Sequence, residues 1–135
     1  MKRKQKKSPY SRTTEVLREQ GFEEFVSYQK VEYFNRWAGS HGQKIDLFNI
    51  IDLLVLDNGI LGIQVCSGGD LLEHIRKLTI EKKSNTITWL QNGGRLEIHG
   101  WRQLLKKKGG KAKKWAPRVI DVLLHDGQPY VEERK

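Results

Sequence analysis

An acid, Asp52, and an amide, Gln64, interrupt two segments that are otherwise rich in Leu, Ile and Val. The segments cover residues 50–56 and 60–66, and Asp-Asn-Gly at 57–59 is a typical turn sequence between two strands. Carboxylate and amide oxygens are hard ligands that suit a divalent cation such as Mg²⁺, with carbonyls and water completing the shell. The alternative is structural, because a buried carboxylate that bonds to Gln64 or to a basic residue is also satisfied.

The length of the turn decides whether Asp52 and Gln64 face each other. A two-residue turn at 58–59 places Asp52 opposite Val65 and points Gln64 to the other face. A three-residue turn pairs Leu56 with Ile60 and places Asp52 across from Gln64. It also leaves one purely apolar face, made of Ile51, Leu53, Val55, Leu61, Ile63 and Val65. We favour this register, because the other would distribute polar groups over two covered faces.

The surrounding patterns predict an α/β fold, a mixed central sheet flanked by helices. A helix is predicted over 11–22, capped by Ser11, followed by a strand over 26–34 and a polar loop over 35–44. A second helix is predicted over 68–83, and 86–94 extends it or forms a shorter helix. Strands follow over 95–101 and 118–125, with a turn at 126–127. We expect one domain over 11–135, preceded by a disordered basic N-terminal tail over 1–10.

The order of these elements, with "ID" at 51–52 and "QVC" at 64–66, resembles the PD-(D/E)xK nuclease superfamily over about residues 12–102. Holliday junction resolvase-like and phage-type members are the most similar in character. The resemblance implies a restriction endonuclease-like core in which Asp52 stands at the acid of the Pro-Asp motif and Gln64 at the second acid. It further implies that Mg²⁺ or Mn²⁺ is bound by Asp52, Gln64, the Val65 carbonyl and, as in some resolvase-like members, Glu15.

Cys66 stands where this superfamily has its lysine, and a thiol cannot replace an ammonium group. Either catalysis is lost and binding remains, or the cation comes from the helix over 68–83, which offers His74, Arg76 and Lys77. Helical periodicity places His74 and Arg76 beside the apolar stripe, whereas chemistry favours Lys77. Lys77 therefore joins Asp52 and Gln64 as a catalytic candidate, and His74 and Arg76 are assigned to nucleic-acid contacts.

Two further acids have competing interpretations. Glu15 lies in the first turns of the predicted helix over 11–22, where an exposed carboxylate also favours the helix dipole. Asp46 lies about 20 Å from Asp52 if the strand is continuous, which is too far to share an ion. A kink at Phe48-Asn49 would change that distance.

The chain carries a formal net charge of +9 and a pI of about 9.7, which favours a polyanionic partner. No acid occurs between Glu97 and Asp121. We predict a basic loop over 105–118 that contacts phosphates and stacks on bases. The nucleic-acid-binding residues predicted in this loop and just before it are Trp101, Arg102, Lys106, Lys107, Lys108, Lys111, Lys113, Lys114 and Arg118. The alternative is a solvated loop whose tryptophans belong to the core.

These observations together predict a Mg²⁺- or Mn²⁺-dependent DNA endonuclease, with branched DNA as a substrate suggested by the resemblance. The alternatives are a degenerate nuclease fold that binds DNA or RNA without cutting, and a small RNA-associated protein in which Asp52 is structural. A single cysteine indicates a reducing compartment, and no apolar run approaches the roughly 20 residues of a membrane span. We expect a cytoplasmic protein of a prokaryotic or phage-infected cell, with no membrane partner and with a homodimer as one possibility.

Overall fold

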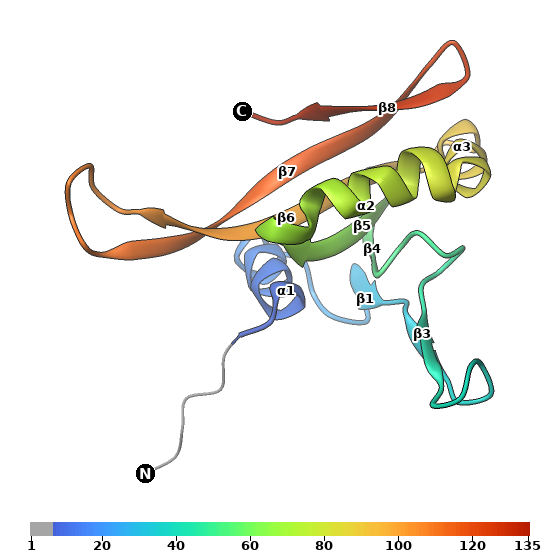
Figure 1. The fold of residues 1–135 in the computed structure, drawn as a ribbon, viewed down its shortest axis with the longest axis horizontal. Coiled ribbons are helices and arrows are strands. Elements are labelled where there is room, and N and C mark those ends of the chain that lie inside the picture. The colour runs from blue at the N-terminus through green and yellow to red at the C-terminus, as the bar shows by residue number, and fades with distance from the viewer. Residues whose placement is uncertain (1–6) are drawn as a thin grey trace.

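The computed structural model describes residues 7–135, in which a six-stranded sheet has the order β1-β4-β5-β6-β7-β8 (Figure 1). The strands are β1 (Tyr28–Lys30), β4 (Leu53–Leu56), β5 (Ile60–Ser67), β6 (Arg95–Leu105), β7 (Lys113–His125) and β8 (Gln128–Glu133). The neighbours β5 and β6 run parallel and the other neighbouring pairs run antiparallel. The predicted α/β class with a mixed sheet is therefore confirmed.

The helices are α1 (Pro9–Glu19), α2 (Leu71–Arg76) and α3 (Lys83–Gln91), with a 3₁₀ turn η1 (Gly68–Asp70) before α2 and a π-helix η2 (Lys77–Glu81) after it. Helix α1 is capped by Ser8 and not by Ser11 as predicted, because Ser8 Oγ accepts the Ser11 N–H at 3.1 Å. Pro9 then occupies a first-turn position, where its fixed φ favours the helix. Residues 9–10, which were predicted to belong to the disordered N-terminal tail, are therefore part of the helix, and residues 1–6 of that tail lie outside the described part of the chain.

The two faces of the sheet bury two different cores, because successive residues of β5 point to opposite sides. On one face, Leu17 of α1 packs with Leu61, Ile63 and residues of β1 and β4. On the other face, residues of α2, η2 and α3 cover Cys66 and the apolar residues of β6 and β7. Figure 1 shows α1 and the α2–α3 segment as separate helical layers.

The predicted register of β4 and β5 is confirmed, since Leu56 pairs with Ile60 across the three-residue turn. Both Asn58 and Gly59 have positive φ in this turn, at 50° and 129°. The strand begins at Leu53 rather than at residue 50, so the predicted apolar face is incomplete. Ile51 packs in the core on the α2–α3 side instead, directly over Gly62.

The predicted strand over 26–34 is divided between two sheets. Its first part is β1, and its last part belongs to β2 (Tyr33–Asn35), which pairs with β3 (Gln43–Ile45). The residues predicted as a polar loop over 35–44 therefore form most of a separate two-stranded hairpin. This hairpin extends away from the main sheet (Figure 1).

The predicted basic loop over 105–118 is the outer part of a long hairpin. Strands β6 and β7 remain paired out to Leu105 and Lys113, and 106–112 alone connect them. The lysines do not break the ladder, because alternating side chains on a projecting hairpin reach water on both faces. Strand β8, which the sequence analysis did not assign, follows the predicted turn at 126–127. Among residues 7–135, no helix is long and apolar enough to cross a membrane.

We expect Gly62→Ala to destabilise the protein by about 1–3 kcal/mol, because overpacking a core forces its neighbours to move. A Cβ at this position would lie 2.7 Å from Cδ1 and 2.8 Å from Cγ1 of Ile51, which positions the chain before Asp52. Denaturant unfolding measures the loss. The control is Gly69→Ala, where a Cβ meets no atom within 4 Å. Equal stabilities of the two variants would contradict this packing of Ile51.

Candidate functional site

A tight loop between β3 and β4 brings Asp46 back toward Asp52. Phe48 and Asn49 both have positive φ, at 51° and 62°, and the N–H of Leu47 donates to the carbonyl of Ile51 at 2.9 Å. The kink considered for Phe48-Asn49 is therefore present, and the separation of about 20 Å calculated for a continuous strand does not apply. Burial of Ile50 and Ile51 in the core on the α2–α3 side anchors the loop.

Asp52 lies where β4 leaves the edge of β5. Its backbone N–H still donates to the Ile63 carbonyl at 3.0 Å. At the next position along β5, the Asp52 side chain replaces the backbone as the hydrogen-bond partner. Asp52 Oδ2 accepts the Val65 N–H at 2.9 Å and Gln64 Nε2 at 3.0 Å. In a strand, the carbonyl of a residue points to the same side as its N–H, so the Val65 carbonyl also faces this edge.

Gln64 connects the two aspartates and is nearly inaccessible to water. Its Nε2 donates to Asp46 Oδ2 as well as to Asp52 Oδ2, both at 3.0 Å. The side chain is 1% exposed, and Oε1 has no hydrogen-bond partner among the described residues. An unpartnered buried oxygen costs free energy. It is therefore an observation that a ligand at this position would explain.

Lys77 is the cation from the predicted helix over 68–83 that the structure places in the site. It is the first residue of the π-helix η2, and its Nζ donates to Asp46 Oδ2 at 2.9 Å. A π-helix changes the angular spacing of side chains and is frequent at functional sites. Of the three cations predicted on the helix over 68–83, Lys77 is the one that reaches the aspartates. The chemical argument favoured Lys77, whereas helical periodicity favoured His74 and Arg76.

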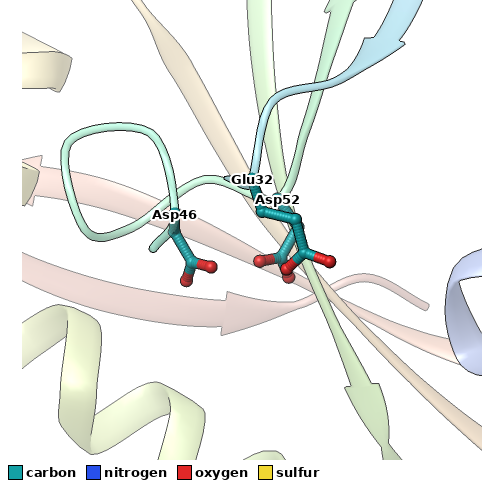
Figure 2. A group of neighbouring side chains, drawn as sticks. All are labelled: Glu32, Asp46 and Asp52. Carbon is teal, nitrogen blue, oxygen red and sulfur yellow. The ribbon is translucent and has the colours of Figure 1, made fainter. Parts of the chain in front are cut away.

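Glu32 is a third acid in the site, and the sequence analysis missed it. One carboxylate oxygen each of Glu32, Asp46 and Asp52 lies within 4.8 Å of the others, as Figure 2 illustrates. Glu32 directly precedes β2, and its carboxylate pairs with Lys30 at 3.1 Å and with Lys44 at 3.9 Å. Its only sequence signal is an acid among aromatic and β-branched residues, since the pairing of β1 with β4 is not visible locally.

The two aspartates have pKa values that are shifted in opposite directions. Burial raises the pKa of Asp52 to about 7, and the adjacent Asp46 adds to this rise. Burial also acts to raise the pKa of Asp46, but hydrogen bonds with Asp52, Lys77 and Gln64 together lower it. Without a cation, the geometry therefore favours one proton on Asp52 beside an ionised Asp46. Carboxylates that lie close together behave in this way.

The group offers an oxygen-rich donor set. It contains three carboxylates, the amide of Gln64 and the carbonyl of Val65, all of the hard type that Mg²⁺ and Mn²⁺ prefer. Rotation of the Gln64 amide would bring Oε1 toward the aspartates in place of Nε2. Of the predicted ligands, the structure brings Asp52, Gln64 and Val65 together and adds Asp46 and Glu32.

Among residues 7–135, the remaining candidates near the predicted motif make no hydrogen bond to this group. Glu15 is on α1, where its carboxylate pairs with Lys7 at 2.6 Å. Cys66 is buried, and burial raises the pKa of its thiol to about 12. His74 is half-buried with Nδ1 enclosed, and burial followed by the charge of Lys77 lowers its pKa. Arg76 is exposed on α2.

Trp101 was predicted to stack on bases, and its burial contradicts that prediction. The ring is 5% exposed, and Nε1 donates to Thr13 Oγ1 of α1 at 2.8 Å. Residues with this parity on β6 face α1, so Trp101 attaches the long hairpin to the helix. Trp115 is accessible, but the Arg12 guanidinium lies 3.7 Å from the centre of its ring.

The lysines of the long hairpin remain exposed, as nucleic-acid contacts require. Arg118 differs, because its guanidinium pairs with Glu133 of β8. We call the outer part of this hairpin, residues 102–114, the basic arm. Its exposed cations are Arg102, Lys106, Lys107, Lys108, Lys111, Lys113 and Lys114.

We expect Asp52→Asn to stabilise the protein in EDTA, and more so at high pH. The unfolded carboxyl ionises near pH 4, whereas the folded one holds its proton to about pH 7. Stability of the wild type is therefore lost as pH rises between these values. The Tm advantage of the variant should grow from about pH 4.5 to about pH 8. Asp126→Asn, in an exposed turn, is the control, and a pH-independent advantage would contradict the raised pKa.

Comparison with known proteins identifies no relative of this chain. No protein-family model, no curated protein and no solved structure matches it. The function must therefore be argued from the geometry of the group formed by Glu32, Asp46, Asp52, Gln64 and Lys77.

Proposed function

We propose that this protein is a metal-dependent nuclease that hydrolyses phosphodiester bonds in DNA with Mg²⁺ or Mn²⁺. The observation that carries the proposal is the convergence of Glu32, Asp46 and Asp52 within 4.8 Å, with the Lys77 ammonium 2.9 Å from Asp46. Rotation of the Gln64 amide, whose Oε1 has no partner among the described residues, would add a further oxygen to this group. Membership in the PD-(D/E)xK superfamily, with a restriction endonuclease-like core, is part of this proposal.

The residues of the site have separable roles in such a reaction. A bound Mg²⁺ would lower the pKa of a water molecule and offset negative charge on the phosphate. Asp46, Asp52 and Glu32 supply the charge that holds a divalent cation, and Gln64 fixes the two aspartates relative to each other. Lys77 holds Asp46 ionised and presents an ammonium group beside it. That group is suited to orient water or to donate to a phosphate oxygen.

The basic arm provides the affinity for the substrate. Its exposed cations are spread over a hairpin that extends beyond the helices (Figure 1). Such side chains neutralise phosphates without reading sequence. A two-stranded ribbon also fits the major groove of duplex DNA. Binding through the arm therefore does not depend on the acidic group.

A nuclease fold that binds DNA or RNA without cutting is the alternative, and Cys66 favours it. The thiol stands where the resemblance expects a lysine, and it stays protonated because burial raises its pKa to about 12. Lys77 weakens the alternative, since it supplies a cation from the helix side of the same group. The two candidates differ in one measurable property, cleavage that requires a divalent cation.

We expect the protein to cut plasmid, single-stranded or four-way-junction DNA in Mg²⁺ or Mn²⁺ and to be inactive in EDTA. Asp52→Asn should lower the rate by about 10²-fold or more, because it removes charge from the cation site. Lys77→Met should lower the rate by about 10- to 10³-fold at unchanged DNA affinity. Gel analysis of timed digests measures both.

Two matched substitutions separate these effects from general damage. Asp126→Asn removes an exposed acid, and Lys83→Met removes a lysine of α3 for which the described residues provide no salt bridge. Both should retain the full rate. DNA retained in a gel shift with no cutting under any divalent cation would refute the nuclease and establish the binding alternative.

We expect substitution of Lys106, Lys107, Lys108 and Lys111 by Gln to weaken DNA binding and to reduce its salt dependence. Each phosphate contact that is lost should lower the slope of log K against log salt by about 0.9 for duplex DNA. Fluorescence anisotropy over a range of salt concentrations gives both quantities. A control with Lys82 and Lys83 changed to Gln should preserve the slope. An unchanged slope in the arm variant would exclude the arm as the phosphate-binding element.

A further inference from the structure

The β2–β3 hairpin is inserted directly into the acidic group. The chain leaves Glu32, forms β2 and β3, and returns at Asp46, so two of the three carboxylates stand at the base of the hairpin. The pairing of Tyr33 with Ile45 closes this base. A ligand that extends along the hairpin to its base would therefore reach the carboxylates.

The hairpin exposes large aromatic side chains to water. Trp37 is 86% exposed, Phe34 is 62% exposed and Tyr33 is 58% exposed. Phe34 has an internal role, because its ring lies across Gly42, where a Cβ would overlap it. The Trp37 ring stays largely in water, although the backbone N–H of Trp37 donates to Asn35 Oδ1 at 3.0 Å and so fixes the turn beneath it. Three large aromatic side chains exposed on one short hairpin exceed the single scattered ones that need no explanation, and they indicate an interaction surface.

The charge around these rings is positive. No acid occurs between Glu32 and Asp46, whereas Arg36 and Lys44 both lie on the hairpin. The Lys44 side chain is 72% exposed, although its Nζ lies 3.9 Å from Glu32, and the Arg36 guanidinium lies 5.7 Å from the centre of the Trp37 ring. Exposed aromatic rings interleaved with cations match the bases and phosphates of an unpaired nucleic-acid strand. An acidic protein segment would satisfy the charges but would leave the ring faces without stacking partners.

We propose that the β2–β3 hairpin binds unpaired nucleotides, with bases stacking on Trp37 and Tyr33 and phosphates contacting Arg36 and Lys44. Bases in an intact duplex are already stacked on each other, so the rings favour single strands, ends or junctions. The proposal deepens the nuclease function and rests on it for the consequence that the adjacent phosphodiester lies near Asp46 and Asp52. The basic arm binds phosphates of either form, and the hairpin selects the unpaired one.

The test measures binding without catalysis. Fluorescence anisotropy in EDTA compares a labelled single-stranded oligonucleotide with a duplex of the same length, for the full chain and its variants. Trp37→Ala should weaken single-strand binding about tenfold, since a stacked base contributes about 1–3 kcal/mol, and should change duplex binding less than about twofold. Trp37→Phe keeps a ring and should restore most of the affinity. Phe25→Ala, at another exposed aromatic residue, should change neither.

Each outcome separates this proposal from the nuclease proposal. Unchanged single-strand affinity in Trp37→Ala would overturn the role of the hairpin, even if metal-dependent cutting is observed. An equal loss for both DNA forms would overturn selection of unpaired bases. A shift from dimer to monomer with unchanged DNA binding, seen by sedimentation, would assign the hairpin to a second copy of the chain instead. Selective loss for the single strand supports the proposal even if the protein does not cut DNA.

Discussion

The hydrogen bond from the Val65 N–H to Asp52 Oδ2 is the interaction on which the site depends. On the N-terminal side of Asp52 the chain turns out of the sheet, so the part of β5 after Ile63 is no longer paired with the backbone of β4. A buried N–H without an acceptor is costly. The Asp52 carboxylate supplies that acceptor, and this holds its position at the strand end. Gln64 then sets Asp46 relative to Asp52 by donating to both.

Charge is the second constraint on the arrangement. Three carboxylates close together repel one another, and burial penalises the ionised forms of Asp46 and Asp52. Lysines from three separate elements offset this negative charge: Lys77 of the π-helix pairs with Asp46, and Lys30 of β1 and Lys44 of β3 pair with Glu32. The proton that Asp52 holds up to about pH 7 lowers the negative charge of the group further. Such a group does not stabilise the fold by itself, and the cores on both faces of the sheet must support it.

The two hairpins use aromatic residues in different ways. On the long hairpin, Trp101 is buried and bonded to Thr13, and Arg12 stacks on Trp115, so these rings attach the arm to α1. On the short hairpin, Trp37 has its ring in water. A tryptophan among cations is therefore not enough to indicate base stacking. Burial against a helix or projection into solvent decides between the two roles.

Local pattern by itself determined the α/β class, the Leu56–Ile60 register and the proximity of Asp52 to Gln64, because alternation and turn length act between neighbours in the sequence. The sequence offered Asp46 and Lys77 as candidates, but only the tertiary structure placed them beside Asp52, and it added Glu32. The position of Asp46 depends on the left-handed conformation of Phe48 and Asn49, which are not glycines and so give no sequence signal for it. The position of Glu32 depends on the pairing of β1 with β4, and that of Lys77 depends on a π-helix. These contacts form between segments far apart in the chain, so no local periodicity of the sequence predicts them.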